Sequence, residues 1–254
     1  NYPMQIIGRS VIAALTVGNA CVLKPAEQAC LTALAFARIA AAAGLPDGVL
    51  NVVPGTGAAA GAALAGHPGV DHVSFTGSTA VGAQVQIAAA ANAVPVTLEL
   101  GGKSPQLVFD DADLDRALPF LVNAGVQNAG QTCSAGSRVL VQRGVYDEVI
   151  WRMAERYGQL QVGPAVADLD VGPLISARQK GMVEGFIEHA RETGLRLAGQ
   201  ARLVADAPAG GHYVRPALYA DVSPDHRLAR EEIFGPVQVV IPFDTEDEAA
   251  AIAN

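Results

Sequence analysis

A single cysteine in a turn-rich stretch is the best candidate nucleophile in this chain. The stretch 128–138 places Cys133 among small residues such as Gly130 and Gly136, ahead of the apolar run 139–141. Small neighbours leave room for a second molecule to approach the sulfur, and a thiolate in such a setting can attack a carbonyl carbon. A lone cysteine is more often a buried structural residue, so the rest of the sequence must decide between the two interpretations.

A carboxylate is the second candidate for chemistry. Glu99 lies in the apolar segment 96–100, directly before Gly101 and Gly102, which permit a sharp backbone turn. Burial of a carboxylate is unfavourable unless the group is partnered or protonated, so a buried Glu99 would be poised as a general base. An alternating strand with Glu99 on its solvent-exposed face explains the spacing equally well.

Two glycine-containing turns could bind a phosphate group. The segment 55–60 has the pattern G-x-G-x-x-A, which alone is a weak signal. The segment 75–82 joins a strand-like run to a helix-like run and offers free N–H groups with the hydroxyls of Ser78 and Thr79. Ser78 could also be an ordinary helix N-cap, so both turns stay open at this point.

A lysine and a carboxylate follow the strand-like run 20–24. Lys24 and Glu27 could bracket the hydroxyls of a ribose, although a solvated loop pair is the simpler interpretation. No histidine has the spacing of a metal ligand with another histidine or a cysteine, so neither a metal site nor a cysteine–histidine hydrolase is predicted. The histidines are His67, His72, His189, His212 and His226.

The elements that must position these residues alternate from residue 19 onward. Strands are predicted at 20–24, 49–53, 71–75 and 96–100, with helices at 28–43, from the glycine-rich turn to about Gly66, and at 78–91. This alternation is typical of a parallel sheet with helices on both faces, whose ligands bind beyond the carboxyl ends of the strands.

The pattern changes near Gly101, where we predict a boundary between domains 1–100 and 101–254. Strands are expected at 106–109 and 138–142, helices at 113–128, 146–160 and 177–193, and loops with short strands at 203–223. Pro242 is expected to end the apolar run 237–241.

Composition favours an acidic, soluble, globular protein. The chain has 254 residues, is 50% hydrophobic and 17% charged, and carries a formal net charge of -8, which argues against nucleic acid or anionic membranes as partners. No apolar run is long enough to span a bilayer. Three cysteines are too few for a disulfide framework, so a reducing cytoplasm is expected. Asn1 and Asn254 both look like cut ends, and we expect a piece of a longer protein.

Six segments, in the same order, resemble the aldehyde dehydrogenase superfamily. Residues 98–105 are similar to its glutamate signature and residues 130–137 to its cysteine signature, and the other matches are Asn1–Pro3, Lys24–Glu27, Phe75–Ser78 and Glu231–Pro236. The resemblance implies an α/β fold: a Rossmann-like parallel-sheet nucleotide-binding domain and a second α/β catalytic domain. It also implies oxidation of a small-molecule aldehyde to a carboxylic acid with NAD(P), through a cysteine thiohemiacetal and a thioester.

The resemblance assigns roles to three catalytic residues. Cys133 would be the nucleophile, Glu99 the base that activates water, and the Asn1 side-chain amide a donor to the oxyanion. Retention of Glu99 favours the hydrolytic type over members that transfer the acyl group to coenzyme A.

For the cofactor, the resemblance implies contacts from both domains. Lys24 and Glu27 would bind the adenosine ribose, Ser78 the pyrophosphate and Glu232 the nicotinamide ribose. The remaining members of this set are Gly55 beside the adenine end, Gly77, Gly101, and Phe234 near the nicotinamide. The Glu27 carboxylate would repel a 2′-phosphate, so NAD is preferred to NADP. No metal is implied.

The resemblance also sets expectations about the whole protein. The longer parent is expected to be a homodimer or homotetramer, and the isolated chain to be unstable or inactive. Ser10 stands where many relatives carry a lysine, with Arg9 beside it. The alternatives are a cofactor-independent thiol esterase or hydrolase that uses Cys133, and a non-catalytic scaffold.

Overall fold

The computed structural model describes all 254 residues, which divide into two units, Asn1–Gly101 and Gly102–Asn254. Each unit combines parallel strands with covering helices, so the predicted α/β class is confirmed. No helix in either unit combines the length and the apolar character needed to cross a membrane.

The first unit contains two pairs of parallel strands. β1 (Cys21–Leu23) pairs with β2 (Leu50–Val52), and β3 (Val73–Thr76) pairs with β4 (Val96–Glu99). All four strands lie where the sequence predicts them. No backbone ladder joins the two pairs, so the expected sheet is present as two separate two-stranded pieces.

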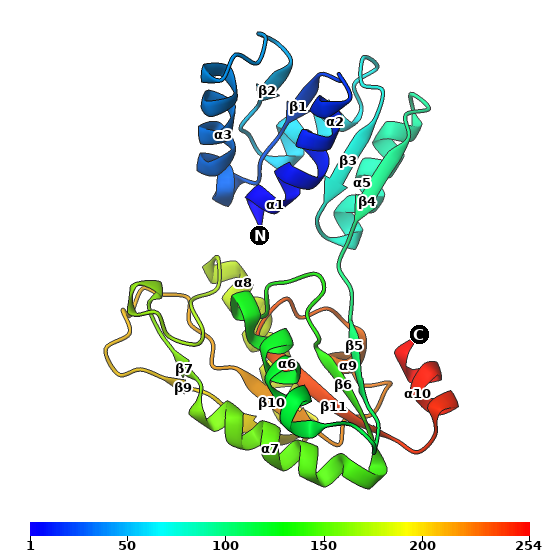
Figure 1. Cartoon of the computed structure of the whole chain (residues 1–254), viewed down its shortest axis with the longest axis vertical. Helices are drawn as coiled ribbons and strands as arrows, with labels where there is room; N and C mark the ends of the chain where they lie inside the picture. Colours follow the sequence, from blue (N-terminus) through cyan, green and yellow to red (C-terminus); the bar gives the residue numbers. More distant parts are fainter. The chain divides into compact units, whose positions relative to one another are not determined.

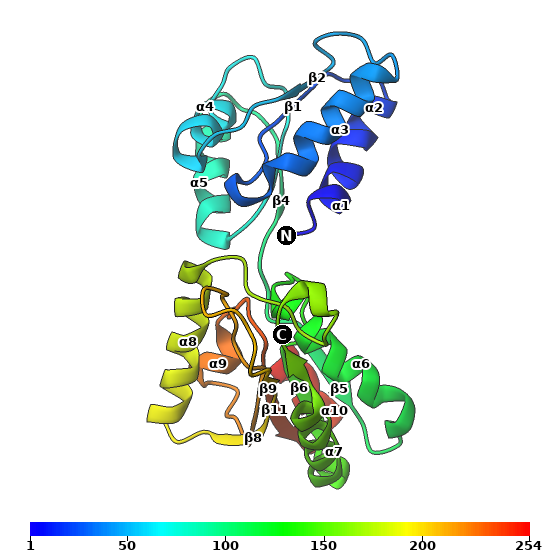
Figure 2. The ribbon, with the colours of Figure 1, turned by 90° about the vertical axis from the view of Figure 1, so that its left-hand side faces the viewer.

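Helices flank these strands on both sides (Figure 2). A run of α1 (Pro3–Ile7), the π-helical turn η1 (Gly8–Ile12) and α2 (Ala13–Thr16) was not expected from the sequence. The small core joins Ile7 and Val11 of this run to Ala33. The other helices are η2 (Glu27–Ala29), α3 (Cys30–Ala42), η3 (Gly57–Gly61), α4 (Ala62–Ala65) and α5 (Thr79–Ala90).

The second unit is built on a five-stranded sheet in the order β5-β6-β11-β10-β8. The strands are β5 (Pro105–Val108), β6 (Arg138–Gln142), β11 (Val237–Phe243), β10 (Ala217–Ala220) and the edge strand β8 (Arg196–Gln200). All pairings are parallel except that of β8, which is antiparallel to β10. The central residues of β6 (139–141) and of β11 (239–241) are consecutive apolar residues because both faces of these strands are buried.

Helices cover both faces of this sheet, α6 (Leu114–Val126) and α7 (Tyr146–Gln159) on one side and α8 (Ala177–Glu192) and α9 (Arg227–Arg230) on the other (Figures 1 and 2). α10 (Glu246–Ala253) follows β11. Short elements complete the unit: η4 (Gln127–Gly130), η5 (Arg143–Val145), β7 (Gln161–Val162), η6 (Ala165–Ala167) and β9 (Arg202–Leu203).

Pro242 does not end its strand, and the prediction that it would was wrong. β11 continues through Pro242, which lies opposite Val141 in the ladder with β6. The Val239 N–H donates to the carbonyl of Ser137, directly before β6, so Val239 directs its nitrogen toward β6. Alternate residues of a strand direct their nitrogens to opposite sides, so the nitrogen of Pro242 is directed toward β10. β10 ends at Ala220, level with the preceding part of β11, so the missing N–H of proline removes no ladder hydrogen bond.

Candidate functional site

In the first unit, a lysine and a glutamate are anchored to the glycine-rich turn after β2. Lys24 Nζ donates to the carbonyls of Pro25 (2.8 Å) and Gly55 (3.0 Å) and lies 3.9 Å from Glu27 Oε1. The Gly57 N–H donates to Glu27 Oε1 at 2.7 Å. Backbone N–H groups of Glu27 itself and of Gly57 lower the pKa of the Glu27 carboxyl. These contacts fix both side chains at the carboxyl ends of β1 and β2, which a solvated loop pair would not show.

Ser78 lies at the carboxyl end of the neighbouring strand β3, as the N-cap of α5. Its Oγ accepts the Val81 N–H at 3.4 Å, so the ordinary capping role is present. A Cβ on Gly77 would stand 2.5 Å from the Phe75 ring, which explains the glycine before the cap. The unbonded N–H groups of the first helical turn and the dipole of this 12-residue helix make the position suitable for an anion.

Glu99, the predicted base, lies on the exposed side of β4. Its side chain is 48% exposed, and its Oε1 lies 3.1 Å from Arg9 Nη1. Arg9 Nη2 also donates to Thr76 Oγ1 at 3.2 Å. The structure therefore corresponds to the solvent-exposed alternative for Glu99, with a cationic partner that the sequence had not indicated. Ser10 Oγ lies 3.5 Å from Ser74 Oγ, and Asn1 is exposed ahead of α1.

In the second unit, the cysteine loop follows a left-handed turn at the end of α6. Asn128, Ala129 and Gly130 have φ of 52°, 54° and 71°. Asn128 Nδ2 donates to the Gln131 carbonyl (2.9 Å), and Gln131 Nε2 donates to the Asn128 carbonyl (3.1 Å). Side chains thus replace the helical bonds lost in this turn, which costs conformational energy for non-glycine residues.

Cys133 itself is exposed, so it is not the buried structural cysteine of the simpler interpretation. The loop carries backbone hydrogen bonds from Gln131, Ala135 and Gly136, whereas the N–H of Cys133 donates to no carbonyl. A thiol and a free backbone N–H on one residue are the two groups needed to attack a carbonyl carbon and to stabilise the resulting oxyanion.

The Cys133 loop lies beside two other segments of the second unit. Each of the three segments leads into one of three adjacent parallel strands. Gly102 precedes β5, Cys133 precedes β6, and Gly235 precedes β11. A Cβ on Gly130 would lie 2.2 Å from the carbonyl carbon of Gly235, and a Cβ on Gly102 would lie 3.7 Å from the Cys133 carbonyl oxygen. The gathering is at the amino ends of the strands, opposite to the edge at which ligands of open parallel sheets usually bind.

Two buried charged atoms in this cluster have no hydrogen-bond partner: Glu232 Oε1 and Lys103 Nζ. Glu232 accepts the Gly102 N–H, which lowers the pKa of its carboxyl, but burial is the larger effect and raises it. An acceptor oxygen without a donor is suited to a ligand hydroxyl, so Glu232 fits the ribose contact that the resemblance implies. Phe234 is held beside it in the left-handed region (φ 52°), and Gln179 Nε2 donates to its carbonyl at 2.9 Å.

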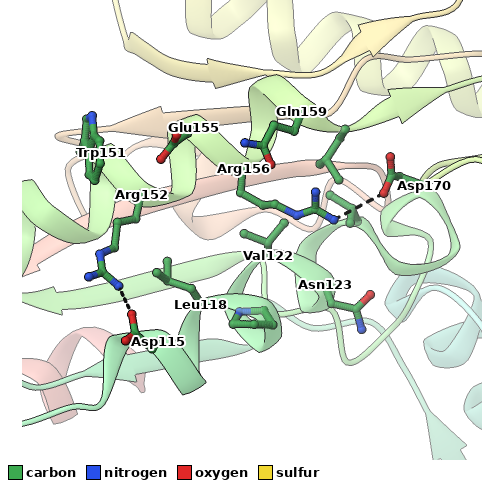
Figure 3. Close-up of a pocket in the computed structure, with 13 residues that line it drawn as sticks. Asp115, Leu118, Val122, Asn123, Trp151, Arg152, Glu155, Arg156, Gln159 and Asp170 are labelled. Atoms are coloured by element: carbon green, nitrogen blue, oxygen red, sulfur yellow. Dashed lines mark hydrogen bonds and ion pairs between the residues drawn. The ribbon is translucent and has the colours of Figure 1, made fainter.

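A groove of the second unit lies elsewhere, between α6 and α7 (Figure 3). It encloses about 690 Å³ and includes Trp151 and Arg152. Arg152 pairs with Asp115 at 2.6 Å, and Arg156 lies 3.5 Å from Asp170. None of the predicted site residues line this groove, and its arginines are already paired, so we do not assign the reaction to it.

The chain belongs to the aldehyde dehydrogenase family, whose model matches residues 1–254. A candidate aldehyde dehydrogenase from Burkholderia cenocepacia is 61% identical, with a TM-score of 0.98 over 100% of this chain and 53% of that one. An aldehyde dehydrogenase from Bacillus cereus is 39% identical, with a TM-score of 0.94 over 99% of this chain and 51% of that one.

A betaine aldehyde dehydrogenase from Staphylococcus aureus, solved with NAD⁺, is 35% identical, with a TM-score of 0.95 over 100% of this chain and 50% of that one. Another structure of that enzyme carries a cysteine modified by β-mercaptoethanol. The present chain therefore spans about half the length of these relatives.

Of the predicted site residues, the structure brings two sets together. Lys24, Glu27 and Gly55 meet in the first unit, and Cys133, Glu232 and Phe234 belong to the gathered segments of the second. Ser78 lies on the other strand pair, β3–β4, and Glu99 pairs with Arg9. Sequence reasoning missed Lys103 and Arg9. Lys103 lies inside the matched glutamate segment, so its charge within apolar surroundings was a usable signal.

Proposed function

We propose that the protein containing this chain is an NAD-dependent aldehyde dehydrogenase that oxidises an aldehyde to a carboxylic acid. The observation that carries the proposal is the exposed Cys133, with a free backbone N–H, on a loop in close backbone approach to the segment of Glu232. Family membership and the NAD⁺ complex of the Staphylococcus aureus relative support it. A modified cysteine in another structure of that relative is consistent with a reactive thiol in the family.

The first steps of the proposed reaction belong to Cys133. Its thiolate attacks the aldehyde carbon, a C–S bond forms, and the carbonyl oxygen becomes an oxyanion. The Cys133 N–H would donate to this oxygen, and the family resemblance assigns the Asn1 amide as a second donor; a donor of this kind is typically worth about 3 kcal/mol of the barrier. When bound, NAD accepts a hydride from the substrate carbon, which leaves a thioester on Cys133.

Glu99 completes the turnover by removing a proton from water. The water oxygen attacks the thioester carbon, the C–S bond breaks, and the carboxylic acid leaves as the Cys133 thiolate is restored. The Glu99 carboxylate is paired with the Arg9 guanidinium at 3.1 Å.

For the cofactor, Lys24 and Glu27 would hold the adenosine ribose, with Gly55 beside the adenine. Ser78, preceded by Gly77, would hold the pyrophosphate, and Glu232 with Phe234 the nicotinamide end; Gly101 completes the set. On this proposal residues 1–100 form the nucleotide-binding domain and residues 101–254 the catalytic domain. The anchored Glu27 carboxylate favours NAD over NADP, since it would repel a 2′-phosphate.

Further properties of the whole protein are proposed on the family resemblance. They are a cytoplasmic location and assembly into a homodimer or homotetramer. The proposed substrate class is a small-molecule aldehyde.

The experiment that tests the proposal measures NADH absorbance with the full-length protein and a panel of aliphatic, aromatic and semialdehyde substrates. We expect NADH formation with at least one aldehyde, and its loss in Cys133→Ala. Ester cleavage without NADH formation from any aldehyde would establish the thiol hydrolase instead. Absence of both activities in a folded protein would favour the non-catalytic scaffold.

A further inference from the structure

Lys103 Nζ is the second buried charged atom without a hydrogen-bond partner near the Cys133 loop. Lys103 leads into β5 directly after Gly102, whose N–H donates to Glu232. Its ammonium is buried, has no hydrogen-bond partner, and interacts with the Glu232 carboxylate. An ammonium and a carboxylate, each with a buried atom that has no hydrogen-bond partner, therefore interact electrostatically without forming a direct ion pair.

The backbone of Lys103 is fixed by a third residue. Arg138 Nε donates to the Lys103 carbonyl at 2.7 Å, and its two other nitrogens donate to the carbonyls of Ile252 and Ala253, each at 2.8 Å. The Arg138 guanidinium is thus held by three carbonyls and cannot turn to pair with Glu232. Lys103 is the cation that remains for this carboxylate.

Without a cation, a buried carboxylate would be strongly unfavourable and would rotate toward water or take up a proton. We propose that Lys103 is a positioning residue that keeps the Glu232 carboxylate charged and directed at a hydroxyl of the cofactor ribose. This inference rests on the proposed function, because Glu232 is the residue assigned to that ribose. On this proposal Lys103 acts through Glu232 and is assigned no cofactor contact of its own.

The charge on Lys103 changes at a moderately alkaline pH. Burial and the neighbouring Arg138 guanidinium lower the pKa of Lys103 to about 8, against the opposing effect of Glu232. The protonated form, which holds Glu232, is therefore complete below this pH and is lost as the pH rises through it. Tight cofactor binding should be lost over the same range.

The test measures equilibrium binding of NAD to the full-length protein with Cys133→Ala in every sample, so that no turnover occurs. The variants are Lys103→Met, Lys103→Arg, Glu232→Gln and the double variant Lys103→Met/Glu232→Gln. We expect Lys103→Met to weaken binding about tenfold, the loss of one charge-assisted contact. In the Glu232→Gln background the same change should have no further effect.

The pH series separates positioning from a general structural role. Without a change at position 103, the dissociation constant should rise as the pH passes about 8. In Lys103→Arg it should stay level, because arginine keeps its charge. Arg191→Met, which removes a cation from an exposed pair with Glu188, is the matched control and should bind NAD normally.

The outcomes are distinct. If the protein with Lys103 binds NAD and a folded Lys103→Met binds it equally well, this inference alone is overturned. It is also overturned if Lys103→Met weakens NAD binding as much in the Glu232→Gln background as it does with Glu232 present. If Lys103→Met does not fold, the pH series decides: a level dissociation constant across pH 8 with lysine present overturns the inference. Failure of the full-length protein to bind NAD at all overturns the proposed function and this inference with it.

Discussion

Gly130 and Gly235 pass so close to each other that a Cβ on Gly130 would overlap the Gly235 carbonyl, at 2.2 Å. One glycine belongs to the cysteine loop and the other leads into β11. Gly130 also adopts φ of 71°, which side-chain-bearing residues rarely do. This close approach fixes the loop of Cys133 against the segment of Glu232. Both partners are backbone atoms, so no side-chain rotation can relieve the clash that an added methyl group would cause.

Replacement of Gly130 by alanine should therefore remove activity and lower the free energy of unfolding by at least about 2 kcal/mol, through backbone strain and overlap. Chemical denaturation and NADH formation measure the two effects. Gly181→Ala is the matched control, because Gly181 lies in α8 with nothing within 4 Å of its added Cβ. That variant should be as stable as the parent or slightly more stable. Equal behaviour of the two variants would contradict the account of this contact.

A buried glutamine connects the sheet to α6 and to the end of the cysteine stretch 128–138. Gln238 Nε2 donates to the carbonyls of Leu121 (2.9 Å) and Gly136 (2.6 Å), and Tyr157 OH donates to Gln238 Oε1 at 2.6 Å. Tyr157→Phe leaves that oxygen buried without a donor and should lower the free energy of unfolding by about 1–3 kcal/mol. Thermal and chemical denaturation test this. Tyr213→Phe, at a hydroxyl without a hydrogen bond, should have almost no effect, and an equal loss in both variants would refute the role of the network.

Much of the fold follows from local sequence signals. Four short runs containing apolar and β-branched residues, with glycine or proline near their ends, predicted the strands of the first unit. The prediction for Pro242 was wrong because a strand can contain proline where the neighbouring strand has already ended. The local sequence around Pro242 does not show where β10 ends. The helical run before residue 17 was missed for a related reason: its packing with Ala33 of α3 is a tertiary contact.

The site was partly predictable. Cys133 and Glu232 were identified through the resemblance, but the sequence does not show that their segments both precede strands adjacent in the sheet. The pairing of Glu99 with Arg9 spans 90 positions of sequence and depends on η1 lying beside the strand end, so spacing could not reveal it. The burial of Lys103 Nζ likewise requires the packed structure.

Arg138 joins three parts of the second unit through the carbonyls of Lys103, Ile252 and Ala253. Arg138→Lys keeps the charge but cannot reproduce three separately directed donors, so it should lower the free energy of unfolding by about 2 kcal/mol. Hydrogen exchange should also increase in α10, whose last carbonyls it binds. Arg143→Lys, in an exposed pair with Asp244, should change neither measurement. Full protection of α10 in Arg138→Lys would contradict this role.

The two units should differ in the free energy of local unfolding. The core of the first unit joins only Ile7, Val11 and Ala33, while Val17 and Leu31 remain more than three-quarters exposed. Nearly all other fully buried apolar side chains belong to the sheet and helices of the second unit. Native-state hydrogen exchange on this 254-residue chain should show faster exchange in β1–β4 than in β6 and β11. Equal protection of the two sets of strands, in one cooperative transition, would contradict the expectation that this chain is marginal on its own.

The most direct measurement of the proposed mechanism is rapid mixing of the full-length protein with NAD and an aldehyde that it oxidises, followed by NADH absorbance. Cys133→Ala should form no NADH, because no thiol is present to attack the carbonyl. Glu99→Gln should release a burst of about one NADH per site and then stop, since hydride transfer precedes the water attack that needs the base. Continued turnover in Glu99→Gln, or any burst in Cys133→Ala, would contradict the assigned roles.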